Sequence, residues 1–385
     1  MLRGSIYGIS DVTMKANASV SVEMRPILKI CNVYITLEES LAKAAAIEVY
    51  TSARSFTVAV WYDAEMSTTE LTLPSEYGLK QETRSDIRQR VSKHASEDGP
   101  QQRVELSFSI EFEGPSNREQ SLTASTSEPG PNCPYMFRCR NCDTDVLAKA
   151  TMFRRVLPLP SADWKEMAAE WFCHKHKDED GSDLSNVVDP KQDELFTSVL
   201  CFNVHKSILA NLGVNRRDEL QCENCSQVMS KACDCNSTTI ELLRTRVDAW
   251  ALNGQPHLLP RANAASVLRH LIKEQLSLSV SCRLILATGD SALLVWVMET
   301  GLQHFKTANL DGGRHPICFQ AVTKVLYRVA DLQSPVVCSW REDALVTVQP
   351  IDSALFEETL GMLSRSRSGS ALDDFMLGFV PECTS

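Results

Sequence analysis

The stretch that decides the fold is Tyr135–Leu147, YMFRCRNCDTDVL, in which Cys139 and Cys142 enclose two residues. A second stretch, LQCENCSQVM, repeats this spacing with Cys222 and Cys225. Two residues between cysteines let both sulfurs turn toward one ion, and two such pairs complete the tetrahedral shell of four sulfurs that Zn²⁺ prefers. The sequence therefore predicts one structural zinc site with these four cysteines as its ligands.

Other assignments of the cysteines remain open. Cys233 and Cys235 follow the second pair closely, so they could complete a local site with Cys222 and Cys225. Alternatively, the pairs are unrelated buried or redox-active thiols, although neither lies at a helix start beside a βαβ pattern, as a thioredoxin-like motif would. Cys133 is a spare in either scheme. A closed site of four thiolates leaves no position for water, so it would brace the fold and catalyse nothing.

Bulk composition limits the classes of protein. The chain has 385 residues, 43% hydrophobic and 23% charged, which is enough to bury a substantial core. A net charge of -10, without a cluster of Lys and Arg, argues against direct nucleic-acid binding. We find neither the apolar run of a signal peptide nor a window long enough to span a bilayer, which predicts an intracellular protein with no membrane contact. Its 14 cysteines are then thiols or metal ligands.

Three regions follow from the sequence pattern. Residues 1–130 are β-rich, because apolar residues alternate in segments such as SFTVAVWYDAEM and RVELSFSIEFE, and they end in a polar linker. Residues 131–240 hold most of the cysteines and form the zinc-braced region. Residues 241–385 form an α+β region. The expected fold class is α+β, mostly antiparallel β with a few helices, braced by the structural zinc site.

Two helices and a hairpin are expected in the last region. ANAASVLRHLIKEQL has apolar residues at helical spacing, while VSCRLILATGDSALLVWVMET is typical of two strands joined by a Gly-Asp turn. DSALFEETLGMLSRS predicts a second helix, capped by Asp352 or Ser353. Its apolar face consists of Leu355, Phe356, Thr359, Leu360 and Leu363.

The segment VLPLPSADWKEMAAEWFCHKHK, residues 156–177, predicts an extended stretch followed by a short helix with Ser161 as its cap. The expected apolar face of that helix consists of Trp164, Met167, Ala168 and Trp171. Cys173 and His174 end the helix. Composition alone favours Cys173 as a small buried residue and His174 as a surface residue. A thiolate and an imidazole side by side could also bind a metal in another protein.

The combination of CRNC, RRVLPLPSADWKEMAAEWFCH and CENC resembles the HECT-like ubiquitin-ligase family, whose members are also described as ubiquitin-conjugating-enzyme-binding proteins. The resemblance is specific over about residues 137–176, moderate around Cys222 and Cys225, and weaker through KVLYRV, CSWRED, LGMLSRS and FMLGFV. It implies a protein that accepts ubiquitin from a conjugating enzyme. Partners would then be ubiquitin and that enzyme, and the location would be cytoplasmic and nuclear.

The resemblance also implies a role in pre-mRNA 3′-end processing. In the family, the proline-tryptophan-cysteine motif is thought to enter the di-zinc active site of the metallo-β-lactamase-type cleavage endonuclease and hold it inactive. By this resemblance Cys173 would bind the partner's zinc as thiolate, His174 would support it, and Trp164 and Trp171 would form a rigid base. Lys175-His176-Lys177 follows where the family has a proline, which predicts a more mobile loop here. The competing class is a non-catalytic assembly chaperone or inhibitor.

A ligase that forms a thioester needs an exposed cysteine of depressed pKa near a flexible joint. Cys318 in HPICFQAV and Cys338 in PVVCSWRED occupy strand-like apolar settings, so we expect both to be buried thiols, and Cys383 lies in the tail. None has the surroundings of a HECT catalytic cysteine. Ubiquitin-protein transferase activity is therefore open, with no catalytic residue assigned.

Overall fold

The computed structural model describes residues 18–38, 45–62, 65–96, 99–115, 129–159, 189–230, 238–307, 312–367 and 374–382. These residues form two compact units, each assembled from separate parts of the sequence. Unit 1 comprises residues 1–122, 296–328 and 363–385, and unit 2 comprises residues 123–295 and 329–362. The division into three consecutive regions stays a prediction.

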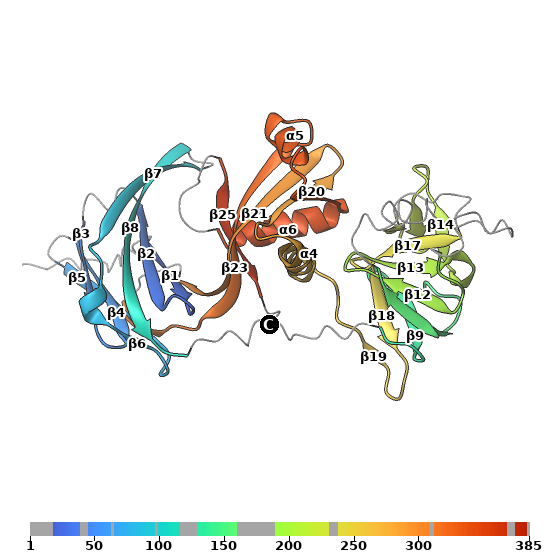
Figure 1. The fold of residues 1–385 in the computed structure, drawn as a ribbon, viewed down its shortest axis with the longest axis horizontal. Helices are drawn as coiled ribbons and strands as arrows, with labels where there is room; N and C mark the ends of the chain where they lie inside the picture. Colours follow the sequence, from blue (N-terminus) through green and yellow to red (C-terminus); the bar gives the residue numbers. More distant parts are fainter. Residues whose placement is uncertain are drawn as a thin grey trace, which may run out of the picture. The chain divides into compact units, whose positions relative to one another are not determined.

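Unit 1 is a β-sandwich. Its larger sheet contains β7 (Arg88–Ser96), β6 (Gly78–Leu79), β8 (Gly99–Glu113), β2 (Ile30–Glu38), β1 (Ala18–Arg25) and the end of β21 (Ser291–Thr307), whose Phe305 lies opposite Val22 (Figure 1). The second sheet has the order β22 (Gly313–Pro316), β5 (Glu65–Thr72), β4 (Ser55–Tyr62), β3 (Ala45–Thr51). β23 (Gln320–Asp331) pairs with β25 (Met376–Pro381), and a short 3-10 turn covers Gln81–Thr83.

The core of unit 1 follows from strand alternation. Val20, Val22 and Met24 occupy every second position of β1 and are fully buried between the sheets. Phe56 of β4 meets Phe108 of β8 edge to face, with ring centroids 6.1 Å apart, so aromatic contact joins the two sheets. The other face of β1 is polar and also buried, with Glu23 and Ser21 in ionic and hydrogen-bonded contacts.

One part of unit 2 consists of short strands, which we call the β module. A first sheet has the order β10 (Thr151–Met152), β9 (Pro134–Cys139), β18 (Val247–Ala251), β19 (His257–Leu258). A second has the order β11 (Arg155–Pro158), β12 (Glu194–Thr197), β13 (Cys201–His205), β17 (Thr239–Leu243), and a third has β14 (Leu212–Val214), β15 (Leu220–Cys222), β16 (Val228–Ser230). A 3-10 turn covers Lys206–Ile208. Stacked rings of Phe137 and Phe202, 4.9 Å apart, join the first two sheets in one core.

The other part of unit 2 contains the helices. α4 (Ala264–Leu278), α5 (Pro335–Arg341) and α6 (Ser353–Arg365) lie around β20 (Arg283–Thr288), which pairs in parallel with β24 (Val346–Pro350) (Figure 1). α4 is capped by Asn263 and α6 by Asp352, whose Oδ1 accepts from the Ala354 and Leu355 amides. The two helices predicted within residues 241–385 and the β20–β21 hairpin are confirmed. Leu355, Phe356, Thr359 and Leu363 are buried as expected, while Leu360 is half-buried. The helix predicted after Ser161 lies outside the described residues.

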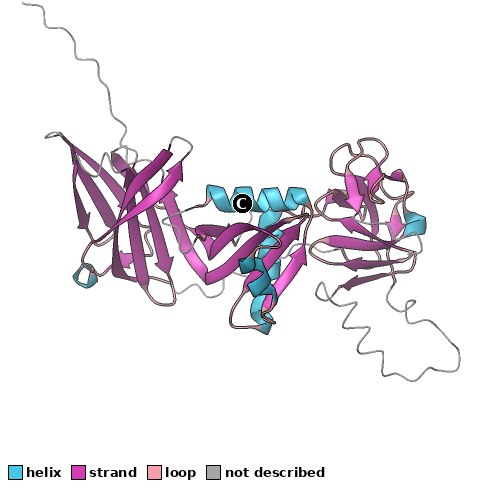
Figure 2. Cartoon of the chain, turned by 90° about the horizontal axis from the view of Figure 1, so that it is seen from above, coloured by secondary structure: helices cyan, strands magenta, loops and turns pink. Residues whose placement is uncertain are grey.

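Strands therefore dominate, and the described part of the chain contains three α-helices (Figure 2). Most strand pairs are antiparallel, with parallel exceptions at β11–β12, β20–β24 and β22–β5. The prediction of an α+β fold that is mostly antiparallel β is confirmed. Among the described residues, each helix is too short or too polar to cross a bilayer.

Candidate metal centre

Four cysteines from two distant stretches meet in the β module. The Sγ atoms of Cys139, Cys142, Cys222 and Cys225 all lie within 4.8 Å of one another. Two of the closest contacts cross between the pairs, Cys139 to Cys225 and Cys142 to Cys222, each at 3.6 Å. A tetrahedral ion with bonds of about 2.3 Å to sulfur would separate its ligands by about 3.8 Å. The cluster could therefore hold a metal ion, as the spacing of the cysteines predicts.

The two pairs are built alike. The amide of the residue after each second cysteine donates to the carbonyl of the first: Asp143 to Cys139, and Ser226 to Cys222, both at 2.8 Å. The amide of each first cysteine donates back to the second residue beyond its pair, to Thr144 at 2.8 Å or Gln227 at 2.9 Å. These reciprocal bonds fold each stretch into a tight turn that directs both sulfurs to the same side.

A left-handed backbone residue closes each turn. Asp143 has φ 60° and Ser226 has φ 58°, in the region that glycine adopts most easily. Aspartate tolerates this region better than most residues with a side chain, and serine tolerates it less well. Because each position directly follows a cysteine of the cluster, the strain is located at the candidate metal centre.

Strand alternation places the first cysteine of each pair inward. Along β9 the buried positions are Tyr135, Phe137 and Cys139, and the short β15 likewise buries Cys222. Cys142 and Cys225 are half-buried. The sulfurs thus lie at the edge of the hydrophobic core that contains Phe137 and Phe202.

The surroundings of the clustered cysteines give their thiols different pKa values. A hydrogen bond with the Thr144 hydroxyl, at 3.2 Å, contributes most to lowering the pKa of Cys142 to about 6. Burial raises the pKa of Cys139 to about 12, and burial also raises the pKa of Cys222. A dication would have to displace the Cys139 proton, because the thiolate is the form that binds metals.

Other residues singled out in the sequence are either outside the cluster or outside the described part of the chain. Cys133 is buried, outside the cluster, with its Sγ 3.5 Å from the Pro134 carbonyl. The alternative ligands Cys233 and Cys235 lie outside the described residues. The partner-binding candidates also lie outside them: Trp164, Trp171, Cys173 and His174. Their roles stay predictions.

The expected burial of two thiols is wrong. Cys318 and Cys338 are both exposed. Cys338 lies in helix α5, whose first residue is Pro335, and helical periodicity buries Val337 and Trp340 while turning Cys338 outward. The apolar residues of PVVCSWRED are compatible with a buried strand or a one-sided helix, and the proline is the signal that favours the helix. Cys318 directly follows the buried Ile317 and faces the other way.

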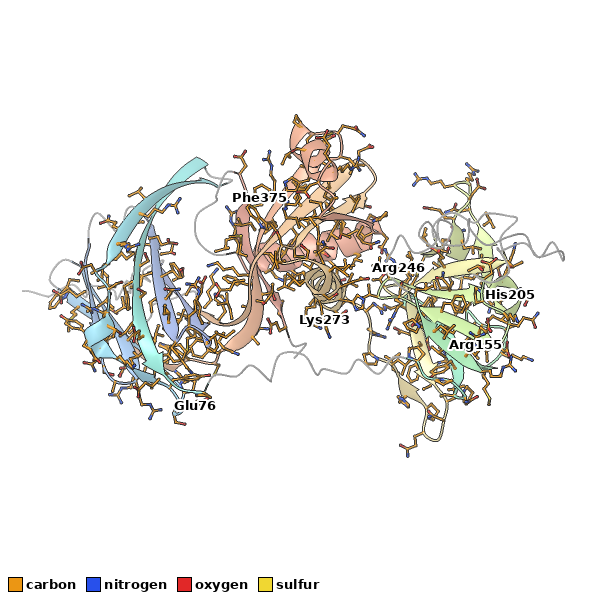
Figure 3. All side chains as sticks on the ribbon, in the orientation of Figure 1. Glu76, Arg155, His205, Arg246, Lys273 and Phe375 are labelled. Carbon is orange, nitrogen blue, oxygen red and sulfur yellow. The ribbon has the colours of Figure 1, made fainter. Side chains whose placement is uncertain are left out.

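Sequence reasoning gave no indication of a cavity in unit 2. It has a volume of about 530 Å³, and its wall includes the end of β17, the chain before α4, α4 itself and the connection from β24 to α6. Arg244, Gln349 and Asp352 contribute buried polar side chains to this wall. Arg246, at the β17–β18 turn (Figure 3), donates to Asp352 at 2.9 Å. This bond fixes the Asp352 carboxylate in the cavity wall.

The comparisons with known proteins agree with the resemblance seen in the sequence. Residues 23–369 match the family described as HECT-like Ubiquitin-conjugating enzyme (E2)-binding. Because this match extends over most of the chain, the protein belongs to that family.

Two curated relatives, from Rattus norvegicus and Mus musculus, are each named as an E3 ubiquitin-protein ligase and are 22% identical over 253 and 254 residues. Both alignments cover 61% of this chain, and they span 66% of the rat protein and 67% of the mouse protein. No solved structure matches the chain.

Proposed function

We propose that this protein is a HECT-like ubiquitin ligase, or a ligase adaptor, that accepts ubiquitin from a conjugating enzyme. The observation that carries the proposal is the family match over residues 23–369, and the names of the rat and mouse relatives support it. Its partners are a conjugating enzyme and ubiquitin, and its location is the cytoplasm and the nucleus. A non-catalytic binding protein of the same family is the alternative.

The ion in this proposal is Zn²⁺, bound by Cys139, Cys142, Cys222 and Cys225. Four sulfurs at these separations match its preferred shell, and harder ions such as Mg²⁺ and Ca²⁺ prefer oxygen ligands. All four positions around the ion would be protein thiolates. The ion therefore braces the β module, and any transfer of ubiquitin takes place elsewhere.

If the protein is a ligase, the acceptor is an exposed thiol. Cys318 and Cys338 are the exposed cysteines of the described residues. Transfer is thiol exchange: the acceptor thiolate attacks the thioester carbonyl of the charged conjugating enzyme, a new thioester forms, and the enzyme's cysteine leaves as thiolate.

Incubation with charged conjugating enzymes, followed by non-reducing electrophoresis, tests this step. We expect a ubiquitin adduct that is cleaved by added thiol. The adduct should disappear in one of the two variants, Cys318→Ser or Cys338→Ser, and that variant identifies the acceptor. If an enzyme binds but both single variants and the native protein remain unmodified, the adaptor alternative is correct. If no conjugating enzyme binds in a broad panel, the proposed function is wrong.

The second part of the proposal is restraint of the 3′-end cleavage endonuclease by Cys173 and His174. Its support is the resemblance of residues 137–176 to the family. Cys173→Ala is expected to weaken binding and restore cleavage, whereas Cys133→Ala, a change of a buried thiol outside the motif, leaves both unchanged. An endonuclease that stays bound and blocked by Cys173→Ala would contradict metal capping.

A further inference from the structure

Arg140 occupies a position that zinc coordination does not require. It lies between the ligands Cys139 and Cys142, so its backbone belongs to the first turn of the metal centre. Its side chain is half-buried, at 24% exposure, and hydrogen-bonds to residues outside that turn. A guanidinium has five donors, and the partners of these donors show what Arg140 holds in place.

Those partners belong to three separate segments. Nε donates to Asp248 of β18 at 3.2 Å, Nη1 to the carbonyl of Ala262 at 3.2 Å, and Nη2 to the carbonyl of Arg244 at 3.1 Å. The Arg140 amide also donates to the Arg246 carbonyl at 2.9 Å. One residue of the metal centre thus binds the β17–β18 turn twice and the chain that enters α4 once.

The segments that Arg140 binds are parts of the cavity wall and of a helix start. Arg244 and Ala262 both line the 530 Å³ cavity. Ala262 directly precedes Asn263, which caps α4 through a reciprocal pair of bonds with Ser266. A displaced Ala262 would therefore disturb the cap of the helix as well as the cavity.

A second carboxylate continues the same network. Asp352, at the start of α6, accepts from Arg246 Nη2 at 2.9 Å and from the Thr245 hydroxyl at 3.2 Å. The turn that Arg140 holds is thus also the turn that anchors α6. Asp248 is only 6% exposed and also pairs with Arg261, so both guanidiniums are held at one buried carboxylate.

We infer that Arg140 is a positioning residue that couples the metal centre to the start of α4 and to the wall of the cavity in unit 2. The inference rests on the proposed zinc site, because the ion fixes the backbone of the turn that carries Arg140. With metal bound, the three acceptors are held in place. With metal removed, the turn relaxes, and the α4 start and the cavity wall loosen with it.

Hydrogen–deuterium exchange of the full chain tests this coupling. The exchange rate is measured in peptides that cover α4 and the residues just before it, and in peptides from β12 and β13. The variant is Arg140→Met, and the matched control is Arg138→Met. Arg138 lies two residues earlier on β9, is 37% exposed, and binds Asp145 at 2.9 Å and Asp143 at 3.5 Å, so it contacts the same turn through other partners. Zinc content is measured for every sample.

We expect Arg140→Met to keep its zinc and yet exchange roughly tenfold faster at the start of α4, because a connected set of buried hydrogen bonds is lost. Arg138→Met should exchange like the native protein there. Chelation of zinc should accelerate the same region in the native protein and add little in Arg140→Met. Arg140→Lys, which keeps the charge but cannot reach all three acceptors, should be intermediate and serves if the methionine variant does not fold.

The inference is overturned if zinc-loaded Arg140→Met, or Arg140→Lys in its place, exchanges at the native rate at the start of α4. It is also overturned if chelation leaves that region unchanged in the native protein. Both results would leave the zinc site itself standing. Absence of metal from the native protein would instead contradict the proposed zinc site.

Discussion

At the scale of single residues, the metal centre depends on two positions that a sequence pattern of cysteines does not reveal. Asp143 and Ser226 each close a turn in the left-handed region, where a glycine would be the ordinary choice. Their conformation follows from the hydrogen bonds that return to Cys139 and Cys222. The spacing of the cysteines was sufficient to predict that these four sulfurs lie close together. The geometry of the two turns could not be predicted from that spacing.

The stability of variants at Ser226 should follow how easily each residue adopts the left-handed backbone conformation. Ser226→Gly is expected to be neutral or stabilising, and Ser226→Val to lower the free energy of unfolding by about 1–2 kcal/mol, since a β-branched side chain is strained at φ 58°. Urea unfolding of zinc-loaded protein measures the difference. Equal stability of the glycine and valine variants would show that the residue does not hold this conformation.

His304 is a second residue whose chemistry depends on burial. Its Nε2 lies 2.9 Å from the Ser21 hydroxyl, and its ring stacks on Phe379 at 3.9 Å. Burial, followed by repulsion from Lys306 and Lys324, lowers the pKa of His304 to about 4. Lys324 is itself paired with the buried Glu23 at 2.8 Å, so a positive charge stays beside the ring.

This shift predicts a loss of stability in acid. Between about pH 6.5 and pH 4, His304 is protonated in the unfolded chain but mostly neutral in the folded chain. The free energy of unfolding therefore falls as the pH falls, by up to about 3 kcal/mol in total. His304→Gln should flatten this part of the stability curve. His257→Gln, at an exposed ring, is the control. A slope unchanged by His304→Gln would refute the assignment.

At the scale of elements, local signals predicted much of the helical part. The period of apolar residues was sufficient to predict α4 and α6. For α6 the sequence also indicated the cap Asp352 and the buried face. The cap of α4, Asn263, was not predicted. α5 was missed because a helix of seven residues, about two turns, is too short to show a clear period, and only Pro335 marks its start. The arrangement of β9, β15 and their turns depended on distant chain segments meeting, which strand alternation does not specify.

Asp352 has two functions at one element, as cap of α6 and as acceptor for Arg246. Asp352→Ala should lower the free energy of unfolding by about 2–4 kcal/mol, because it removes a cap and leaves the half-buried guanidinium of Arg246 without its partner. Asp352→Asn should cost less, since the amide oxygen can still cap.

Glu113→Ala supplies the control for this series. Glu113 is 76% exposed and 3.7 Å from Lys80, and its removal should change stability by less than about 1 kcal/mol. Urea denaturation of all three variants gives the comparison. Equal costs for Asp352→Ala and Glu113→Ala would contradict the buried role of Asp352.

At the scale of the whole molecule, contacts between remote parts of the sequence decide the architecture. β1 pairs with the end of β21, with Val22 opposite Phe305, so the first described strand completes its sheet with a strand from the last third of the chain. The two units therefore interleave in sequence. Composition could indicate a β-rich beginning and an α+β end, but no local pattern specifies a partner hundreds of residues away.

Metal analysis of the purified full chain tests the central claim most directly, that sulfurs from two distant stretches bind one ion that braces unit 2. We predict close to one zinc per chain, absent from Cys222→Ser, which should also lose several kcal/mol of stability. Zinc affinity should rise about tenfold or more per pH unit, since the Cys139 proton must leave. A native chain that is metal-free and as stable with chelator as without it would contradict the account.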